Sequence, residues 1–175
     1  YASSRESLAL NGFTGEQEEA VRETCRRLEV STGILSAEDC GAVPWVAAAR
    51  AEAAVRKELG DDLMPPPASG EWTVHDRDRP RRSRLYAPGN RPRFIEKAAA
   101  SGADGVILDL EDSVSPDRKG EARILVSYAL RNVDFGVSEI MVRINQGYEA
   151  TDDLSWIVPQ PVQHILIPRW RTPTR

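Results

Sequence analysis

The second half of the chain alternates short apolar runs with helical segments, and this alternation constrains the fold more than any other feature. The run GVILDL at residues 105–110 is apolar up to its aspartate, as expected of a parallel strand covered on both faces. The same reading predicts three more strands, at 85–87, 139–145 and 164–168. It also predicts two helices, at 91–101 and 115–132. Repeating βα units of this length indicate an α/β fold with a parallel sheet and right-handed crossovers.

Start signals support both of these helices. Asn90 is predicted as the N-cap of the first helix, with Pro92 in its first turn. Ser115 is predicted to cap the second helix, with Pro116 at its first position. The second helix is expected to bury one apolar face, made of Ala122, Leu125, Val126 and Ala129.

The first half of the chain is organised differently. Residues 61–81 hold three consecutive prolines and alternating charge, which is the composition of a linker. We therefore expect one domain at 1–60 and a second at 82–175. Helices predicted at 15–30 and 43–60, with a short strand between them, make the first domain a small α+β unit.

Composition limits the possible partners. The net charge of −4 argues against a general nucleic-acid partner, and the basic cluster at 77–84 lacks interleaved aromatic residues. No apolar run approaches the length of a membrane span, so no membrane partner is expected. Cys25 and Cys40 have no metal-ligand spacing, and we interpret them as reduced thiols of a cytoplasmic protein.

Polar residues gather where two predicted strands end, which is where parallel α/β sheets bind ligands. Asp109 and Glu111 alternate with leucines and should point to one face, and Asp112 follows them. Arg143 lies near the end of the next strand, where a charged side chain is costly unless it is paired. It either forms a structural ion pair with these carboxylates or also grips a substrate carboxylate or carbonyl.

The first strand of the second half ends in PGNRPR, which predicts an anion site. Gly89 suits a tight turn, and Arg91 and Arg93 stand at the start of the following helix. Lys97 adds a third cation one to two turns later. Free N–H groups, the positive end of the helix dipole and guanidinium groups together favour phosphate. The alternative is that the arginines are simply solvated.

These residues resemble a known family. The segments RRSRLYAPGNRPR, ADGVILDLEDSV and VRIN, in this order within residues 81–169, are similar to the citrate lyase β subunit and its relatives in the HpcH/HpaI aldolase group, which includes malyl-CoA lyases. The resemblance implies a (β/α)8 TIM barrel, of which this chain would hold about the first four βα units. It also implies reversible cleavage of a carbon–carbon bond beside a thioester, with Mg2+ holding the keto-acid part.

The resemblance also implies roles for particular residues. Three match residues that hold coenzyme A or its carrier-bound equivalent, namely Tyr86, Arg91 and Lys97. Arg143 matches the arginine that binds the substrate, and the DLED carboxylates Asp109, Glu111 and Asp112 lie near it and the metal in the family. The family's Mg2+ ligands would fall beyond residue 175, so the isolated chain is expected to be inactive.

The first domain resembles the second half of the citrate lyase acyl carrier, the γ subunit, with similar residues at 41–42 and 49–55. That carrier bears a coenzyme-A-like prosthetic group on a serine, which by this alignment lies upstream of Tyr1. A carrier joined to a lyase presents its tethered thioester at high effective concentration. The expected partners are an acyl-thioester substrate and other subunits of an oligomer or lyase complex.

Two alternatives to a citryl-thioester lyase stay open. One is a malyl-CoA-type lyase, which differs in its product rather than in any residue of this sequence. The other is a non-catalytic carrier or assembly subunit, in which a half-barrel pairs with another chain through the strand at 164–168. A full barrel needs about 250 residues and eight strands, so the sequence is expected to be a fragment or a truncated form.

Overall fold

A computed structural model describes residues 19, 23, 44–59 and 76–168 of the chain. The chain divides into two compact units, Tyr1–Met64 and Pro65–Arg175, and each is described by itself. The first unit contains helix α4 (Pro44–Leu59), so the helix predicted at 43–60 is confirmed. Pro44 occupies its first turn, where a missing N–H costs nothing.

Several predictions for the first half lie outside the described residues. They concern most of the helix at 15–30, both cysteines and the linker up to residue 75. The end of the predicted linker is described, and there Arg81 forms a two-pronged ion pair with Glu139 while Arg82 pairs with Asp104. These contacts attach residues 81 and 82 to the second unit. The domain limits themselves stay a prediction.

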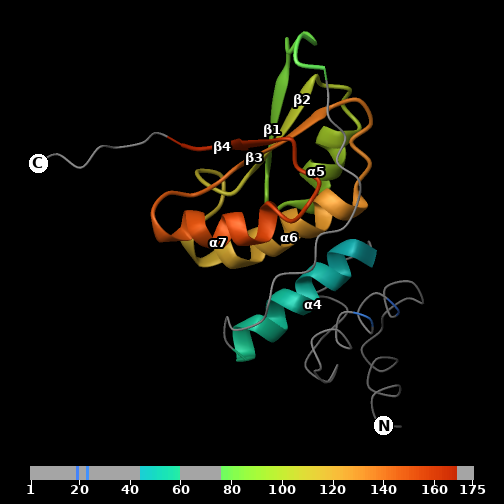
Figure 1. The fold of residues 1–175 in the computed structure, drawn as a ribbon. Helices are drawn as coiled ribbons and strands as arrows, with labels where there is room; N and C mark the ends of the chain where they lie inside the picture. The colour runs from blue at the N-terminus through green and yellow to red at the C-terminus, as the bar shows by residue number, and fades with distance from the viewer. Residues whose placement is uncertain (1–18, 20–22, 24–43, 60–75, 169–175) are drawn as a thin grey trace, which may run out of the picture. The chain divides into compact units, whose positions relative to one another are not determined.

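The second unit is built on four parallel strands in sequential order (Figure 1). The strands are β1 (Arg84–Pro88), β2 (Gly105–Asp109), β3 (Glu139–Arg143) and β4 (His164–Leu166). Every residue of β2 is buried, as its uniformly apolar sequence predicts for a central parallel strand. The register places Asp109 opposite Arg143, so the two charged residues end neighbouring strands side by side.

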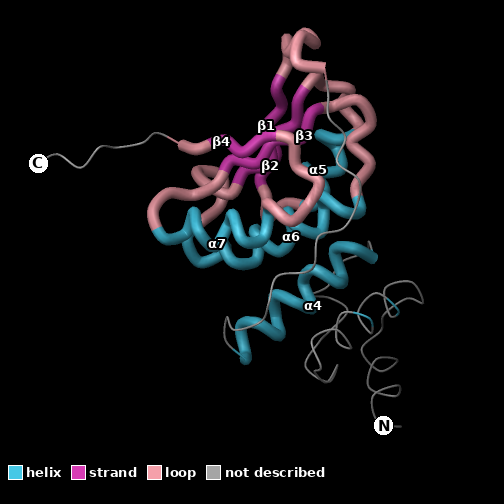
Figure 2. Tube along the Cα trace, viewed as in Figure 1, coloured by secondary structure: helices cyan, strands magenta, loops and turns pink. Residues whose placement is uncertain are grey.

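Helices connect successive strands and gather on one side of the sheet (Figure 2). They are α5 (Pro92–Ala99), α6 (Lys119–Asn132) and α7 (Tyr148–Ile157). Sequential parallel strands with right-handed crossovers put every helix on the same face, as in consecutive units of a (β/α)8 barrel. The predicted α/β fold class is confirmed, and the apolar face predicted for α6 at Ala122, Leu125, Val126 and Ala129 is buried.

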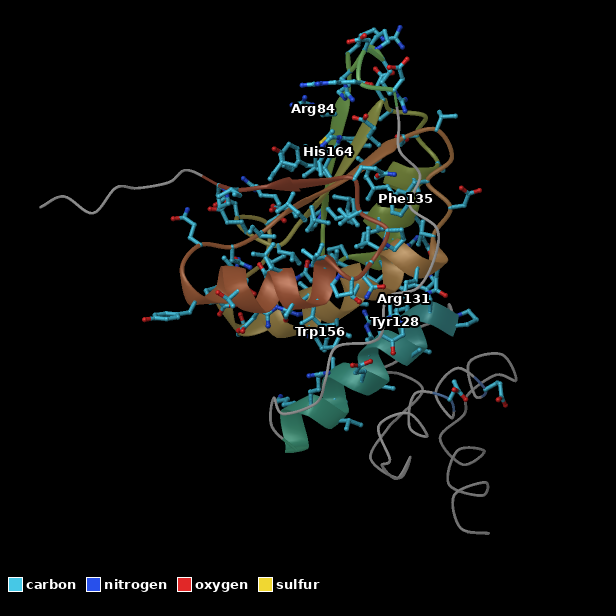
Figure 3. The ribbon with its side chains drawn as sticks, in the orientation of Figure 1. Arg84, Tyr128, Arg131, Phe135, Trp156 and His164 are labelled. Atoms are coloured by element: carbon cyan, nitrogen blue, oxygen red, sulfur yellow. The ribbon has the colours of Figure 1, made fainter. Side chains whose placement is uncertain are left out.

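The opposite face of the sheet carries polar and aromatic side chains as well as apolar ones. Figure 3 shows Arg84 of β1 and His164 of β4 on the side of the sheet away from α6 and α7. Tyr86 and His164 belong to one row of the register, together with the buried Met141 of β3. No helix in the described part of the chain has the length and apolar character needed to cross a membrane.

Two helix starts differ from the prediction. Asn90 is not the N-cap of α5, because Pro92 is already the first helical residue and the cap position falls to Arg91. Ser115 does not start an α-helix either. Residues Pro116–Arg118 form a 3-10 turn, and α6 begins only at Lys119. Neither Ser115 nor Arg91 makes a side-chain capping hydrogen bond.

Candidate active site at the carboxyl ends of the strands

Arg143 and Asp109 form the centre of the candidate site. The guanidinium Nε donates to Asp109 Oδ1 and Nη2 donates to Oδ2, both over 2.7 Å. This two-pronged geometry is the strongest arrangement of an arginine with a carboxylate. Asp109 is only 1% exposed, so the pair satisfies a carboxylate that would otherwise be buried without a counter-charge.

Two further carboxylates approach the outer edge of the same guanidinium. Arg143 Nη1 lies 3.1 Å from Glu111 Oε2 and 3.1 Å from Asp112 Oδ2. Asp112 is largely exposed, whereas Glu111 is half-buried and also accepts a hydrogen bond from the amide of Gln146. The predicted cluster of Asp109, Glu111, Asp112 and Arg143 is therefore brought together around one arginine.

Tyr86, which the resemblance placed with Arg91 and Lys97 as a coenzyme A contact, lies beside Arg143 in the structure. The centre of its ring lies 5.2 Å from the guanidinium carbon of Arg143, which is within range of a cation–π interaction. Its side chain is 51% exposed, so it offers an aromatic face to solvent or to a ligand. Tyr86 thus belongs to the Arg143 cluster rather than to a separate site.

The electrostatics of the cluster follow from these contacts. Burial raises the pKa of Asp109, but hydrogen bonds from Arg143, Ser113 and Glu111 outweigh it and lower that pKa to about 2. The pKa of Arg143 is raised, chiefly by the hydrogen bond to Asp109. Both groups therefore stay charged at neutral pH. Three carboxylates against one arginine leave an excess of negative charge.

The lowered pKa of Asp109 predicts a loss of stability in acid. A carboxylate with a depressed folded-state pKa contributes stability above its unfolded value of 3.8, and loses it as the pH falls toward 2. The shift corresponds to at most about 2 kcal/mol. Urea unfolding at pH 5 and pH 2.5 should show this loss in the wild-type chain and a smaller one in Asp109→Asn.

The comparison with Asp109→Asn is needed because protonation of Asp104 in acid also lowers the stability of the folded chain. Its pKa is also lowered, mainly by hydrogen bonds from Arg82 and the Ser83 backbone. Asp104 remains in both proteins, so only the difference between them reports Asp109. Equal losses in the two proteins would contradict the assigned role of the Arg143–Asp109 pair.

The turn between β1 and α5 is packed against the cluster. A Cβ at Gly89 would lie 2.8 Å from Val126 Cγ2 and 2.9 Å from the Asp109 carbonyl oxygen, so only glycine fits. Asn90 follows it, 7% exposed, and its Oδ1 has no hydrogen-bond partner. A buried amide oxygen without a partner fits a site that receives a polar ligand group.

The predicted phosphate-binding cations are spread along α5. Arg91 is the N-cap residue, whereas Lys97 lies in the last turn of the helix, about 9 Å further along its axis. Arg93 is four residues before Lys97, so these two cations lie on the same side of the helix. All three are exposed and, in the part of the chain that the structure describes, form no ion pair. The structure therefore separates Arg91 and Lys97 instead of bringing them together.

The described residues do not offer a ready magnesium site. No group of three or more histidine, cysteine, aspartate or glutamate side chains among them is arranged to hold a metal ion. The three carboxylates around Arg143 are each engaged by its guanidinium. The three carboxylates are arranged to bind the Arg143 guanidinium, and we assign none of them as a metal ligand.

Four residues around the site were missed by sequence reasoning. Lys119 of α6 contacts the loop after β2, and Arg123 of α6 pairs with the buried Asp153 of α7. Asp153 in turn holds Asn145, which follows β3. The helix α7 itself was not predicted. Two signals were available: a charged residue next to the predicted apolar face of the helix, as at Arg123, and the segment VRIN, which ends in Asn145.

Comparison with known proteins places this geometry in a family. Residues 82–175 match the family described as HpcH/HpaI aldolase/citrate lyase. Residues 4–58 match the malonate decarboxylase delta subunit (MdcD) of the acyl carrier protein group. The first match covers more than half of the chain and contains the whole Arg143 cluster.

Individual relatives agree with the family match. The chain is 47% identical over 83 residues to an L-malyl-CoA/beta-methylmalyl-CoA lyase of Cereibacter sphaeroides, covering 47% of this chain and 23% of the relative. It is 40% identical over 98 residues to citrate lyase subunit beta of Leuconostoc mesenteroides subsp. cremoris, covering 54% of this chain and 32% of that subunit. The matched part thus spans 23% and 32% of the length of these two relatives.

A solved structure is also similar, that of CitE from Mycobacterium tuberculosis complexed with the triphosphate group of ATP. It is 31% identical, with a TM-score of 0.39, over 49% of this chain and 37% of that chain. The family match covers residues 82–175, in which the strands and the charged cluster lie. The chain belongs to the HpcH/HpaI aldolase/citrate lyase family.

Proposed function

We propose that the protein is a carbon–carbon lyase acting on an acyl thioester, with Arg143 as the residue that binds the reacting substrate. The observation that carries this proposal is the asymmetric engagement of the guanidinium. Its Nε and Nη2 are fixed by the buried Asp109, whereas its Nη1 lies 3.1 Å from both Glu111 and the exposed Asp112. An exposed ion pair contributes little, so a substrate oxygen can replace Asp112 without disturbing the buried pair.

The proposed chemistry needs positive charge at a defined place. Cleavage beside a thioester passes through an enolate, and a preorganised cation lowers the energy of that state. Arg143 is preorganised because Asp109 holds two of its donors and the Tyr86 ring lies over its carbon. Asp109, Glu111 and Asp112 are proposed to set the position and charge of Arg143. We further propose Mg2+ as a cofactor, with ligands that are not among the described residues.

The group proposed to carry the acyl thioester is coenzyme A or a coenzyme-A-like prosthetic group. The match of residues 4–58 to an acyl carrier group supports a carrier unit joined to the lyase unit. Such a tether raises the effective concentration of the acyl group at the site. Both citryl and malyl thioesters are candidates, since citrate lyase and malyl-CoA lyase are both among the relatives. Oxaloacetate as product would identify the first, and glyoxylate the second.

The coenzyme A proposal predicts a specific loss of affinity. Arg91→Ala should weaken binding of coenzyme A by about tenfold or more, because a charge-assisted hydrogen bond to phosphate is lost. It should also flatten the salt dependence of binding, since one fewer cation meets the phosphates. Lys97→Ala should have a smaller effect, because Lys97 lies at the far end of α5. Titration calorimetry at two salt concentrations measures both quantities.

A matched control for this titration is Arg84→Ala. Arg84 is also an exposed arginine, but it begins β1 and so lies at the opposite end of that strand from Arg91. Its removal should leave the affinity unchanged. Equal effects of Arg84→Ala and Arg91→Ala would mean that only net charge matters, and the phosphate site at the start of α5 would have to be given up.

A further inference from the structure

Two loops frame Arg143. A cation of α6, Lys119, contacts the first loop directly, and a second cation, Arg123, is linked to the other loop through Asp153 of α7. The first loop follows β2 and carries Glu111 and Asp112. Lys119, in the first turn of α6, donates its ammonium hydrogens to the carbonyl oxygens of Leu110, at 2.7 Å, and of Glu111. These two carbonyls belong to the segment that turns away from the sheet, so Lys119 fixes the backbone that presents both carboxylates to Arg143.

The second loop, residues 144–147, directly follows β3 and carries Asn145 and Gln146. Asp153 of α7 is fully buried, and its Oδ2 accepts hydrogen bonds from the backbone N–H and the side-chain amide of Asn145, both at 2.8 Å. Its other oxygen accepts from Arg123 Nε at 2.8 Å. Arg123 is itself 8% exposed and also reaches Glu149 at 2.8 Å. Asn145 is therefore held through a buried carboxylate that depends on Arg123.

Lys119 and Arg123 both lie at the start of α6. Lys119 and Arg123 are four residues apart in α6 and therefore lie on the same side of its first two turns. A lysine on a helix usually extends into solvent, but this one is half-buried and bonded to two carbonyls of another element. Arg123 offsets the charge of a carboxylate with no exposed surface, which would be costly to leave unpaired.

We propose that Lys119 and Arg123 are positioning residues of the Arg143 site. Lys119 sets the loop that carries Glu111 and Asp112, and Arg123 sets, through Asp153, the loop that carries Asn145 and Gln146. Gln146 in turn donates to Glu111, so the two loops meet at that carboxylate. This inference rests on the proposed function, because the Arg143 site is the proposed active site of the lyase. The positions of the two loops can nevertheless be measured in the folded chain without any substrate.

The test uses NMR on the 175-residue chain with four substitutions. Lys119→Met and Arg123→Met remove the cations, and Lys119→Arg restores a donor that reaches both carbonyls. Arg118→Met is the control, because Arg118 is adjacent in sequence but pairs with Glu121 within its own helix region. The readouts are the Nε–H signal of Arg143 and amide hydrogen exchange at Glu111, which donates to Asp109, and at Asn145, which donates to Asp153.

The expected changes are local and differ between variants. Lys119→Met should speed exchange at Glu111 by about tenfold, and Arg123→Met should do the same at Asn145, because each loses the equivalent of one buried hydrogen bond. Both should shift the Arg143 Nε–H signal, while Lys119→Arg and Arg118→Met should leave it in place. If Arg123→Met does not fold, Arg123→Lys should still speed exchange at Asn145, because it keeps the charge but only one donor group.

A purely structural role predicts a different pattern. Exchange would then rise to the same extent at Glu111 and Asn145 in every variant, and the Arg143 signal would not move in a folded protein. Either result, or failure of Lys119→Arg to restore the wild-type signal, would overturn the proposal. Absence of lyase activity would bear only on the proposed function, since none of these readouts involves a substrate.

Discussion

Replacing Arg143 with methionine is expected to lower the free energy of unfolding by about 3–5 kcal/mol at pH 7. The reason is the state of Asp109 after the change. This carboxylate is 1% exposed, stays charged at pH 7 and would keep only backbone and hydroxyl donors. A buried charge without a counter-charge is among the few defects of this size that one substitution can produce. Urea unfolding of the two proteins measures the difference.

Two companion variants separate charge from bulk. Arg93→Met removes an arginine that is exposed and belongs to no ion pair of the described residues, so its effect should stay within about 0.5 kcal/mol. The double variant Arg143→Met, Asp109→Asn should recover part of the loss, because the unpaired charge is gone. If Arg143→Met costs less than about 1 kcal/mol, the buried pair does not have the assigned importance.

The parts of the site that follow from strand order could be predicted from the sequence. Asp109 and Arg143 each occupy the carboxyl end of an apolar strand, and neighbouring parallel strands bring such ends together. The cost of burying a lone arginine then indicated a carboxylate partner. Both steps need only the local sequence pattern and the rule that parallel strands end at the same edge of a sheet. The cluster could therefore be predicted from the sequence alone.

The parts that depend on distant contacts could not be predicted. Helix α7 has the sequence YEATDDLSWI, in which threonine and aspartate are weak helix formers. Its acidic residues are compensated by Arg123 of α6, which lies 30 positions before Asp153 in the chain. The misplaced cap at Asn90 has a local cause. Asparagine suits a cap position, but the helix starts one residue later than predicted, and the Asn90 side chain is buried instead.

The site also predicts a large kinetic effect of a small chemical change. Arg143→Lys keeps the positive charge but cannot bind Asp109 with two donors and present a third to a substrate. We expect it to lower kcat/KM of the proposed lyase at least a hundredfold, the usual cost of losing one preorganised donor to a developing negative charge. Coenzyme A affinity should stay unchanged, because the proposed phosphate contact is at Arg91.

The 175-residue chain alone is expected to show no turnover. Its described residues offer no group of carboxylates that could hold Mg2+, and the carboxylates near Arg143 are engaged by it. Asp112 and Tyr86 at this site are exposed to water, which weakens electrostatic stabilisation there. Turnover by this chain that needed both Mg2+ and Arg143 would show that the four strands suffice.

Arg143 is proposed to bind the reacting substrate of a thioester lyase. The most direct measurement is the release of acetyl-CoA from citryl-CoA and from malyl-CoA, with Mg2+, by the natural gene product that carries residues 82–175. We predict turnover of one of the two thioesters, a loss of at least a hundredfold in Arg143→Lys, and wild-type activity in Arg93→Lys. Wild-type kcat/KM in a folded Arg143→Lys protein, or cleavage of neither thioester, would contradict the account.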